Sequence, residues 1–299
     1  MKELYLGIDG GGTKTAVCVI DEKLNIISQS QSGPSSYDTV SQEVFVANVK
    51  DALSKLEYDG KIVSVFAGLG GICNQDDANV VINSLKSIDC LKDAIIDVDN
   101  DVTNAYYSSF GTEDGIVAII GTGSVVYGIH NGKSHRCGGY CYQEGDAGSS
   151  YDLGRKALQY YAKVIDKRLP ETVFSKAIGE FINVHNFADL AHYFVNATRT
   201  EIANVARIVT KHQEESEALK IINESVDSMV EMFMGVYNEL KFDSVDFAII
   251  GSLGNAETMY RKLLFKKLKE NVQNVNFVNS KYEAYLGSSI KALINYERK

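Results

Sequence analysis

The stretch GIDGGGTKTAVCVID, residues 7–21, decides the fold of this chain. It joins two apolar segments, Glu3–Ile8 and Lys14–Asp21, through three consecutive glycines. A hairpin turn needs fewer glycines, and each one costs backbone entropy. Consecutive glycines do, however, let backbone N–H groups approach a bulky anion closely. The sequence therefore predicts two strands joined by a phosphate-binding turn.

The stretch AIIGTGSVVYGIH, residues 118–130, repeats this arrangement in the second part of the chain. A strand at Gly115–Ile120 leads into the small residues Gly121–Ser124, and a strand at Val125–Ile129 follows. Such an internal repeat indicates two similar halves. Two halves that face each other would place both glycine turns across one cleft.

The rest of the pattern is that of an α/β protein, in which helices dominate residues 151–241. Further strands are expected at Leu24–Gln29, Lys61–Ala67, Ala94–Val98, Phe247–Ile250 and Val275–Val278. Helices are expected at Ser41–Lys55, Asp76–Ser87, Asp101–Phe110, Tyr151–Asp166, Phe174–Asn183, Phe187–Asn196, Thr200–Lys211, Ser216–Leu240, Ala256–Asn271 and Glu283–Tyr296.

The length of 299 residues fits two domains. We predict a first domain at 1–114 and a second at 115–299. The last helix is a candidate for packing back on the first domain. Because the chain has only two prolines and no linker-like segment, the boundary is expected to be a tight crossing.

The composition excludes several classes of protein. A hydrophobic content of 45% rules out intrinsic disorder, and no apolar run reaches the ~18 residues of a membrane helix. A net charge of −9 argues against nucleic acid, because phosphate neutralisation needs a basic face. Asp9 comes too early for a signal peptide, and five scattered cysteines suit a reduced compartment. We expect a cytoplasmic protein that binds neither nucleic acid nor membrane.

Asp9 stands directly before the first glycine turn, in a D-x-G-x-T-x-T pattern that ends at Thr15. The turn is not a Walker A loop, because a strand and not a helix follows it. A carboxylate beside a bound phosphate would repel it unless a cation lay between them. We therefore expect Asp9 to bind Mg²⁺, directly or through water. The alternative is an acid that hydrogen-bonds its own turn.

The second turn, Gly121–Ser124, offers backbone N–H groups and two hydroxyls that suit phosphate oxygens. The segment 143–149 is rich in acids and glycines. Because carboxylates bind pairs of sugar hydroxyls, this segment predicts a hydroxyl-lined pocket, with an ordinary surface loop as the alternative. Cys137 and Cys141 lack the second pair of ligands that a tetrahedral metal site needs.

Asp97, Asp99 and Asp101 alternate at the end of an expected strand. If a helix begins after Asn100, Asp101 lies at its N-cap or in its first turn. A carboxylate at this end of a strand could accept a proton from a substrate hydroxyl. Phosphoryl transfer needs such a base, together with Mg²⁺ and positioned donors.

Three segments together resemble the phosphate and adenosine motifs of the actin–hexokinase–heat-shock ATPase superfamily: GIDGGGTKT at 7–15, GTGS at 121–124 and IIGSLGNAETMY at 249–260. The segment GGYCYQEGDAGSSYDLG, at 138–154, is similar to the sugar-binding segment of the N-acetylglucosamine kinase group. That group lies in the BadF/BadG/BcrA/BcrD ATPase family, and the resemblance spans nearly the whole chain.

The resemblance implies two ribonuclease-H-like domains that flank a nucleotide cleft, the actin-like ATPase and sugar kinase fold, with helical insertions in the second domain. It also implies ATP and Mg²⁺ as cofactors, an amino sugar as substrate and a homodimer. Asp101 would be the catalytic base for the sugar 6-hydroxyl, and Asp9 would handle Mg²⁺.

The other site residues follow from the same resemblance. ATP and its phosphates would be bound by Gly11, Gly12, Thr13, Lys14, Gly121, Thr122, Gly123, Ser124, Gly251 and Gly254. The sugar would be bound by Ser36, Gly70, Asp101, Thr122, Gly123, Tyr140, Glu144 and Asp146.

The chain departs from the family pattern at four positions. Tyr140 replaces a usual Trp, and Ala147 replaces a second acid. Ser36 stands where an Asn often contacts the sugar, and Gly70 where a Ser is common. These changes bear on which sugar is bound, not on the class of reaction.

The sequence thus predicts an ATP-dependent kinase that phosphorylates the 6-hydroxyl of N-acetylglucosamine or N-acetylmuramic acid, or of both. The alternatives are a glucosamine or glucose kinase, and an ATPase activator or switch protein of the same family. A switch protein would hydrolyse ATP without any sugar.

Overall fold

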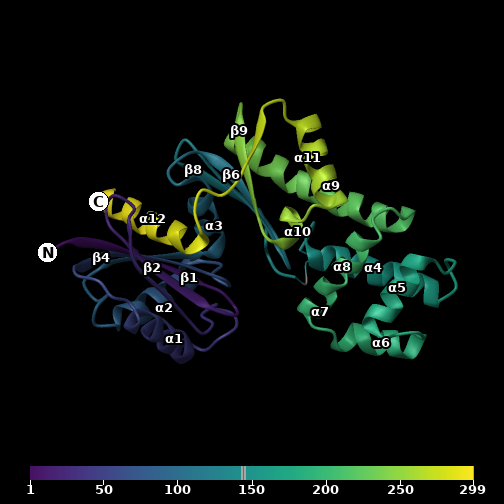
Figure 1. The fold of residues 1–299 in the computed structure, drawn as a ribbon, viewed down its shortest axis with the longest axis horizontal. Coiled ribbons are helices and arrows are strands. Elements are labelled where there is room, and N and C mark those ends of the chain that lie inside the picture. Colours follow the sequence, from purple (N-terminus) through teal and green to yellow (C-terminus); the bar gives the residue numbers. More distant parts are fainter. Residues whose placement is uncertain (143, 145, 299) are drawn as a thin grey trace. The chain divides into compact units, whose positions relative to one another are not determined.

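The structure is a computed structural model that describes residues 1–142, 144 and 146–298. Its contacts divide the chain into two compact units. The first unit is Met1–Glu113 with Asn279–Lys299, and the second is Asp114–Val278. The division therefore lies next to the boundary expected after residue 114, but the last helix belongs to the first unit (Figure 1).

The first unit is built on a five-stranded sheet in the order β3-β2-β1-β4-β5. Its strands are β1 (Glu3–Gly10), β2 (Thr15–Ile20), β3 (Ile26–Ser32), β4 (Lys61–Leu69) and β5 (Ile95–Asn100). The first three strands are antiparallel neighbours, whereas β4 and β5 run parallel to β1. The carboxyl ends of β1, β4 and β5 therefore lie at the same end of the sheet.

Helices cover both faces of this sheet (Figure 1). One face carries α1 (Gln42–Ser54) and α2 (Gln75–Lys86), and the other carries α3 (Asp101–Phe110) and α12 (Ala284–Glu297). The yellow α12 lies against the purple strands, and its residues pack directly on β1.

Side chains alternate along β1, as a strand buried on both faces requires. Leu4, Leu6 and Ile8 belong to the core that includes α1 and α2. A side chain at position 7 would lie on the opposite face, but Gly7 has none. A Cβ there would lie only 2.7 Å from the Cβ of Ser288 in α12. The glycine at this position therefore lets α12 approach the sheet closely.

The second unit repeats the sheet in the order β10-β9-β6-β7-β8. Its strands are β6 (Gly115–Ile120), β7 (Ser124–His130), β8 (Lys133–Gly138), β9 (Val245–Ile250) and β10 (Val275–Val278). Again the first three strands are antiparallel and the last two run parallel to the first. The α/β fold with an internal repeat, expected from the sequence, is confirmed.

The edge strand β8 was not expected. Its sequence, KSHRCG, carries no apolar alternation, and its residues are exposed or half-buried. It forms because β7 offers a free edge and pairs with it along its whole length. Polar residues are usual on such an edge strand.

Helices make up most of the second unit. They are α4 (Ser150–Ile165), α5 (Val173–Ile182), α6 (Phe187–Asn196), α7 (Arg199–Asn204), α8 (Ala206–Lys211), α9 (Ser216–Leu240), α10 (Ser252–Asn255) and α11 (Met259–Asn271). The helix expected at Thr200–Lys211 is in fact two, α7 and α8, divided at Val205. The helix expected from Ala256 begins only at Met259.

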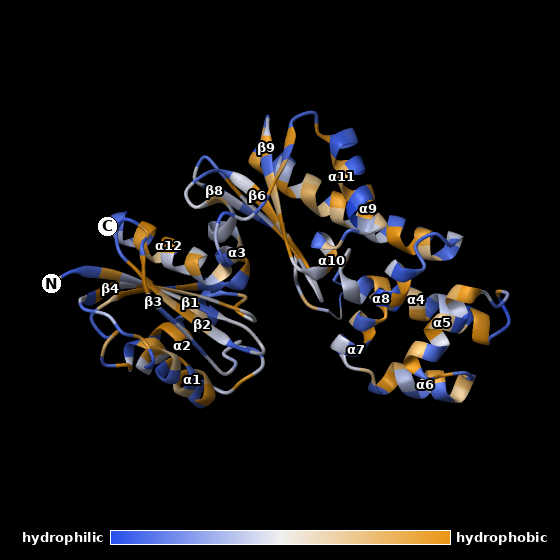
Figure 2. Ribbon diagram, viewed as in Figure 1, coloured by the Kyte–Doolittle hydropathy of each residue, from blue (hydrophilic) through white to orange (hydrophobic). Residues whose placement is uncertain are grey.

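Apolar residues fill the core of the second unit, and Figure 2 shows them as orange segments of its central strands. Phe247 of β9 contacts Phe233 of α9, with ring centroids 4.9 Å apart. A Cβ on Gly128 of β7 would lie 2.8 Å from Val236, so α9 also packs closely on the sheet. Within the described residues, no helix has the length and apolar content that crossing a membrane requires.

Candidate functional site

The first glycine turn connects β1 to β2 and is closed by a hydrogen bond from Gly11 N to Lys14 O at 3.0 Å. Beyond its chain neighbours, a Cβ on Gly11 would meet nothing closer than 3.8 Å, and one on Gly12 nothing closer than 4.0 Å. Packing within the chain therefore does not explain these two glycines. Thr13 and Lys14 are exposed on the same turn. The turn thus has the open backbone that close approach of an anion needs.

Asp9, the last residue but one of β1, is held by a side chain that the sequence did not single out. Asn104 Nδ2 donates to Asp9 Oδ1 at 2.7 Å and to the carbonyl of Gly68 at 3.0 Å. Asn104 is 1% exposed, and a Cβ on Gly68 would overlap its amide. A glycine in β4 therefore makes the space in which Asn104 reaches Asp9.

The environment of Asp9 disfavours its negative charge. Burial raises the pKa of this carboxyl to about 6, and the charge of Asp101 adds to the effect. The hydrogen bond from Asn104 and the charge of Lys14 act in the opposite direction without cancelling it. A cation at this position would relieve the cost of the charge.

Asp101 is the first residue of α3, but it does not cap the helix. The cap is Asn100, whose side chain accepts a hydrogen bond from Val102 N at 3.3 Å. Capping of α3, the structural role considered for Asp101 as an alternative to catalysis, is therefore performed by Asn100. Asn104, the residue that holds Asp9, is three positions further along the same helix and so lies on the same side of it as Asp101.

The expected sugar residues of the first unit lie beside Asp101. A Cβ on Gly70 would be 3.8 Å from Asp101 Oδ2 and 2.7 Å from Ser36 Oγ. The Ser36 hydroxyl donates to Asp38 Oδ1 at 2.6 Å, so its oxygen still offers lone pairs to a ligand. Asp38 is a second acid at this place that the sequence did not single out.

The carboxylates of the first unit fit a Mg²⁺ ion that arrives with a nucleotide. Mg²⁺ is usually bound by one or two carboxylates and completes its shell with water and phosphate oxygens. Asp9 and Asp101 are close enough for the charge of one to raise the pKa of the other. Among the described residues, no group of three or more His, Cys, Asp or Glu side chains could hold a metal by itself.

The second glycine turn connects β6 to β7 and supports the start of α4. Gly121 N donates to Gly123 O at 3.0 Å. The backbone N–H groups of Ser150 and Tyr151 donate to the carbonyls of Gly121 and Thr122, at 2.9 and 3.2 Å. The first turn of α4 is therefore attached directly to this glycine turn.

The Ser124 hydroxyl is used within the fold. It donates to the carbonyl of Ala147 at 2.6 Å, and the residue is only 5% exposed. This bond ties β7 to the acid- and glycine-rich segment. In this structure the hydroxyl therefore supports the segment that carries Asp146.

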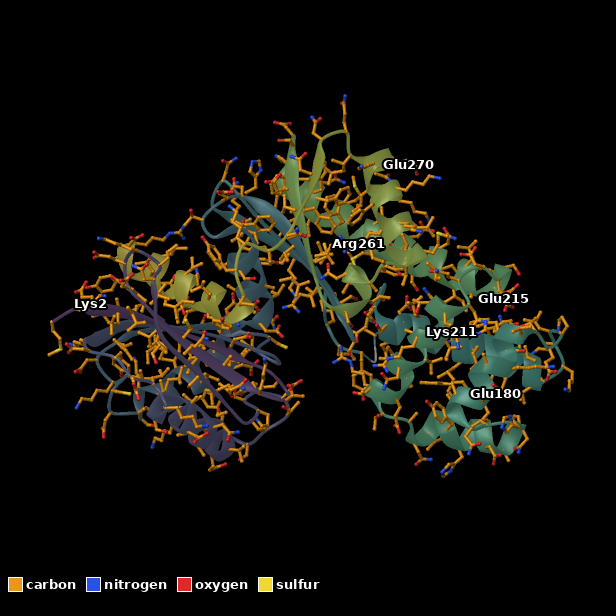
Figure 3. All side chains as sticks on the ribbon, viewed as in Figure 1. Lys2, Glu180, Lys211, Glu215, Arg261 and Glu270 are labelled. Atoms are coloured by element: carbon orange, nitrogen blue, oxygen red, sulfur yellow. The ribbon has the colours of Figure 1, made fainter. Side chains whose placement is uncertain are left out.

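The expected adenosine turn lies against the second glycine turn. Gly251 has a φ of +110°, and a Cβ on it would be 2.5 Å from the carbonyl oxygen of Ile120. A Cβ on Gly121 would be 4.0 Å from the Cα of Gly251. Gly254 follows in α10, and its carbonyl accepts from Arg261, a residue labelled in Figure 3, at 3.3 Å. The structure therefore brings two of the predicted motifs together within one unit.

The acid- and glycine-rich segment divides into an exposed and a buried part. Tyr140 is 79% exposed and Glu144 is exposed as well, whereas Asp146 is 4% exposed. Gln143 and Gly145 lie outside the described residues. Asp146 is thus buried, whereas Tyr140 and Glu144, which were also predicted to bind the sugar, are exposed.

A buried carboxylate fixes the end of this segment. Asp152 of α4 accepts from Gly148 N at 3.1 Å, from Lys156 Nζ at 2.8 Å and from Ser225 Oγ at 2.7 Å. Tyr260 also donates to the carbonyl of Gly148, at 2.5 Å. The backbone that follows Asp146 is therefore anchored to α4, α9 and α11.

Asp146 itself forms an ion pair with Arg199, the first residue of α7. Arg199 Nη2 and Nε lie 2.6 and 3.1 Å from Asp146 Oδ2. A Cβ on Gly123 would overlap Arg199 Nη2 and would lie 3.1 Å from Asp146 Oδ1. The ion pair therefore lies directly on the second glycine turn. No sequence pattern singled out Arg199, because it lies in a helical insertion far from both motifs.

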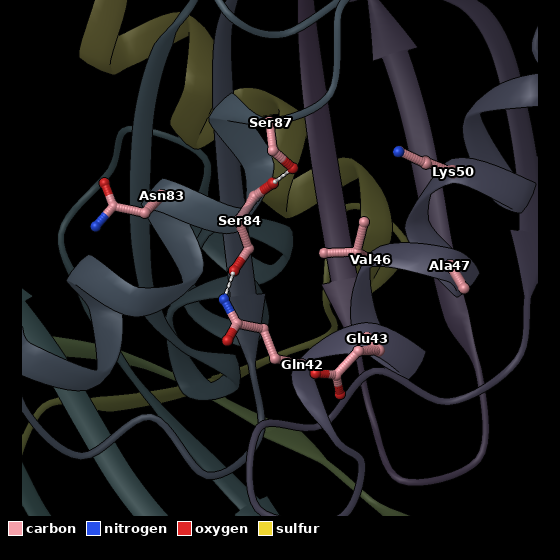
Figure 4. A pocket seen from close by; sticks show the side chains of 8 residues that line it. All are labelled: Gln42, Glu43, Val46, Ala47, Lys50, Asn83, Ser84 and Ser87. Atoms are coloured by element: carbon pink, nitrogen blue, oxygen red, sulfur yellow. Dashed lines mark hydrogen bonds between the residues drawn. The ribbon is translucent and has the colours of Figure 1, made fainter.

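A surface groove of about 560 Å³ contains none of the residues predicted to act in catalysis or binding. It lies between α1 and α2, and Figure 4 shows its lining side chains. Gln42 donates to Ser84 Oγ across it at 2.6 Å. The groove is thus separate from the carboxyl ends of β4 and β5.

Comparison with known proteins agrees with these features. The model of the BadF/BadG/BcrA/BcrD ATPase family matches residues 6–292. The chain belongs to this family. The resemblance inferred from the glycine turns and the adenosine motif is therefore confirmed.

Two relatives are similar over nearly their whole length. One, from Clostridium acetobutylicum, is named N-acetylmuramic acid/N-acetylglucosamine kinase, and it is 27% identical over 96% of this chain and 97% of its own. The other, from Dictyostelium discoideum, is named N-acetyl-D-glucosamine kinase, and it is 25% identical over 98% of both chains.

A solved structure confirms the fold. It is that of a Chromobacterium violaceum protein with the provisional name N-acetylglucosamine kinase. The TM-score is 0.75 and the sequence identity 19%, over 97% of this chain and 98% of that one. This likeness concerns the fold alone.

Proposed function

We propose that this family member is an ATP-dependent kinase that phosphorylates the 6-hydroxyl of an amino sugar. The observation that carries the proposal is the meeting of Asp101, Ser36 and Gly70 at the end of β4 and β5. There a carboxylate that could take a proton lies beside polar groups suited to sugar hydroxyls. The names of the relatives from Clostridium acetobutylicum and Dictyostelium discoideum support the same class of substrate.

In the proposed reaction the oxygen of the 6-hydroxyl forms a bond to the γ-phosphorus of ATP. The bond between that phosphorus and the bridging oxygen breaks, ADP leaves, and the hydroxyl proton passes to the carboxylate of Asp101. The N–H groups of Gly11 and Gly121 close their own turns, and those of Gly12, Thr122 and Gly123 would hold the phosphates. This chemistry depends on position and charge, and needs no covalent intermediate on the protein.

Asp9 would hold the Mg²⁺ that accompanies ATP, and Asn104 would orient that carboxylate. When bound, Mg²⁺ would neutralise charge on the β- and γ-phosphates. Asp146 would bind sugar hydroxyls, and Thr122 and Gly123 would lie near both sugar and phosphate. Gly251 and Gly254 would line the adenosine site.

The test is a coupled assay of ADP release with ATP, Mg²⁺ and a panel of sugars. The panel holds N-acetylglucosamine, N-acetylmuramic acid, glucosamine, N-acetylmannosamine and glucose. We expect strong stimulation by one or both of the first two sugars. ADP release that no sugar stimulates would refute the proposal and favour the ATPase switch instead.

A homodimer, as the family resemblance implies, would be checked by light scattering on the same preparation. A monomer that phosphorylates the sugar at a normal rate would remove the dimer from the proposal without affecting the kinase.

A further inference from the structure

The ion pair between Arg199 and Asp146 holds a cation at the second glycine turn. The Asp146 side chain is 3% exposed, whereas that of Arg199 is 41% exposed. The two bonds use Nε and Nη2, and a guanidinium carries three further N–H groups. The buried carboxylate thus anchors one side of the guanidinium, and its other side remains within reach of a ligand.

The stability of α7 does not explain this arginine. Thr198 and Glu201 already form a capping box at the start of the helix. A cation in the first turn of a helix is electrostatically unfavourable, because the N-terminus carries the positive end of the dipole. The position of Arg199 must therefore be explained by the groups that it contacts.

A ring and a glycine fix the orientation of the guanidinium. Its carbon lies 5.7 Å from the centroid of the Tyr142 ring, which itself stands edge-on to Tyr151 at 5.6 Å. A Cβ at Gly123 would overlap Nη2, so a side chain there would displace the guanidinium from this position. The planar group thus lies close to both an aromatic ring and the backbone that is proposed to bind phosphate.

We infer that Arg199 is a catalytic residue that donates hydrogen bonds to the phosphoryl group during its transfer. The inference rests on the proposed function, in which Gly121–Gly123 hold the phosphates of ATP. In the transfer, negative charge lies on the oxygens of the γ-phosphoryl group while its bond to ADP breaks and its bond to the sugar oxygen forms. A preorganised guanidinium stabilises such a group more than it stabilises bound ATP.

Asp146 then has two partners, the sugar on one side and Arg199 on the other. Because the guanidinium is held by a buried acid, it does not need to be ordered at the moment of reaction. The same contact would couple the position of the sugar to that of the arginine.

The experiment compares Arg199→Gln and Arg199→Lys with the wild type and with Arg168→Gln. Arg168 forms an ion pair with Asp166 at the surface of the same unit, with its side chain 59% exposed, and so serves as a matched control. For each protein we would measure kcat, the KM of ATP and the KM of each sugar. Thermal unfolding checks that each variant folds.

We expect Arg199→Gln to lower kcat about 10²-fold while the KM of the sugar hardly changes, as expected for a group that acts mainly in the transition state. Arg199→Lys should recover part of the loss, since it retains the charge but not the planar fork. Arg168→Gln should match the wild type.

Two results would overturn the inference. A rise in sugar KM at an unchanged kcat would mean that Arg199 only positions Asp146. A loss confined to N-acetylmuramic acid, with N-acetylglucosamine unaffected, would assign the guanidinium to the carboxylate of the sugar.

A binding measurement separates this inference from the proposed function. Calorimetry with ADP, Mg²⁺ and aluminium fluoride, a mimic of the phosphoryl group in transfer, does not require turnover. Arg199→Gln should weaken this complex at least tenfold more than it weakens binding of a non-hydrolysable ATP analogue. Equal effects on both ligands would refute the role of Arg199. A wild type that phosphorylates no sugar, yet shows the difference in binding, would refute only the choice of substrate.

Discussion

The amide of Asn104 and the carboxylate of Asp9 form one positioned pair, with Nδ2 and Oδ1 2.7 Å apart. The same amide nitrogen also donates to the carbonyl of Gly68 at 3.0 Å. Asn104 thus fixes the acid of the first glycine turn relative to β4, and the helix that carries Asn104 begins with Asp101.

Replacing Asn104 by Ala should raise the Mg²⁺ concentration needed for half-maximal activity. The half-buried carboxylate of Asp9 would lose its hydrogen-bond donor and its fixed orientation, and stability should fall by about 1–3 kcal/mol. Activity would be titrated with Mg²⁺ at saturating ATP, and unfolding followed in urea. An unchanged Mg²⁺ requirement in a folded variant would show that Asn104 does not position Asp9 for the metal.

Replacing Asp9 by Asn should abolish Mg²⁺-dependent turnover and yet stabilise the protein at pH 8. Burial raises the pKa of Asp9 from 3.8 to about 6, so the ionised carboxylate costs folded-state stability. The cost is absent below the unfolded pKa near 4, grows as the pH rises to about 6, and is complete above that. Asn in its place can still accept the hydrogen bond from Asn104.

The measurement is urea unfolding of both proteins at pH 4 and pH 8. We expect the variant to be more stable by about 1–3 kcal/mol at pH 8 and equal to the wild type at pH 4. A variant that is less stable at both pH values would contradict the raised pKa.

Replacing Asp101 by Asn should lower kcat by ~10²-fold or more while sugar binding is largely retained, because the amide cannot accept the hydroxyl proton. The matched control is Asp97→Asn, in β5 directly before α3, where the carboxylate accepts a hydrogen bond from Asn295 of α12 at 2.8 Å. Steady-state kinetics and calorimetry with the sugar would distinguish the two. Near-normal turnover of Asp101→Asn would remove this residue from the role of base.

Two glycine substitutions should differ in what they change, one lowering stability and the other weakening ATP binding. Gly7→Ala should destabilise the protein by about 1–3 kcal/mol, because its Cβ would meet Ser288 at 2.7 Å and force α12 away from the sheet. Gly12→Ala should leave stability nearly unchanged, since its Cβ would have 4.0 Å of free space, but should raise the KM of ATP. Unfolding curves and ATP titrations test both. A strong loss of stability in Gly12→Ala would mean that the turn is glycine-rich for folding and not for its ligand.

Local pattern was sufficient for most of the secondary structure. The two strand–turn–strand repeats are followed by the same sheet order in both units, and Asp101 does begin a helix. The strand β8 was not predicted because its sequence carries no apolar alternation. It is a strand because it pairs with the edge of β7. The division of one expected helix into α7 and α8 could not be seen either, because both halves share one apolar period.

The candidate site was predicted only where it lies on a motif. Asp9, the first glycine turn and Asp101 are adjacent to strand ends of the first unit, and parallel strands of one sheet bring such ends together by geometry alone. Arg199 and Asn104 carry no such signal. Each becomes relevant through one contact across the fold, with Asp146 and with Asp9 respectively.

The sequence by itself determined the repeated α/β architecture and the family, because glycine-rich turns and hydrophobic periodicity are local properties of the chain. Only the tertiary structure decided which side chains serve those turns. Asp146 is buried and paired while Glu144 is exposed, although both lie in one short segment. Such differences arise from packing between residues distant in sequence, which fixes burial and charge pairing, and no local pattern records them.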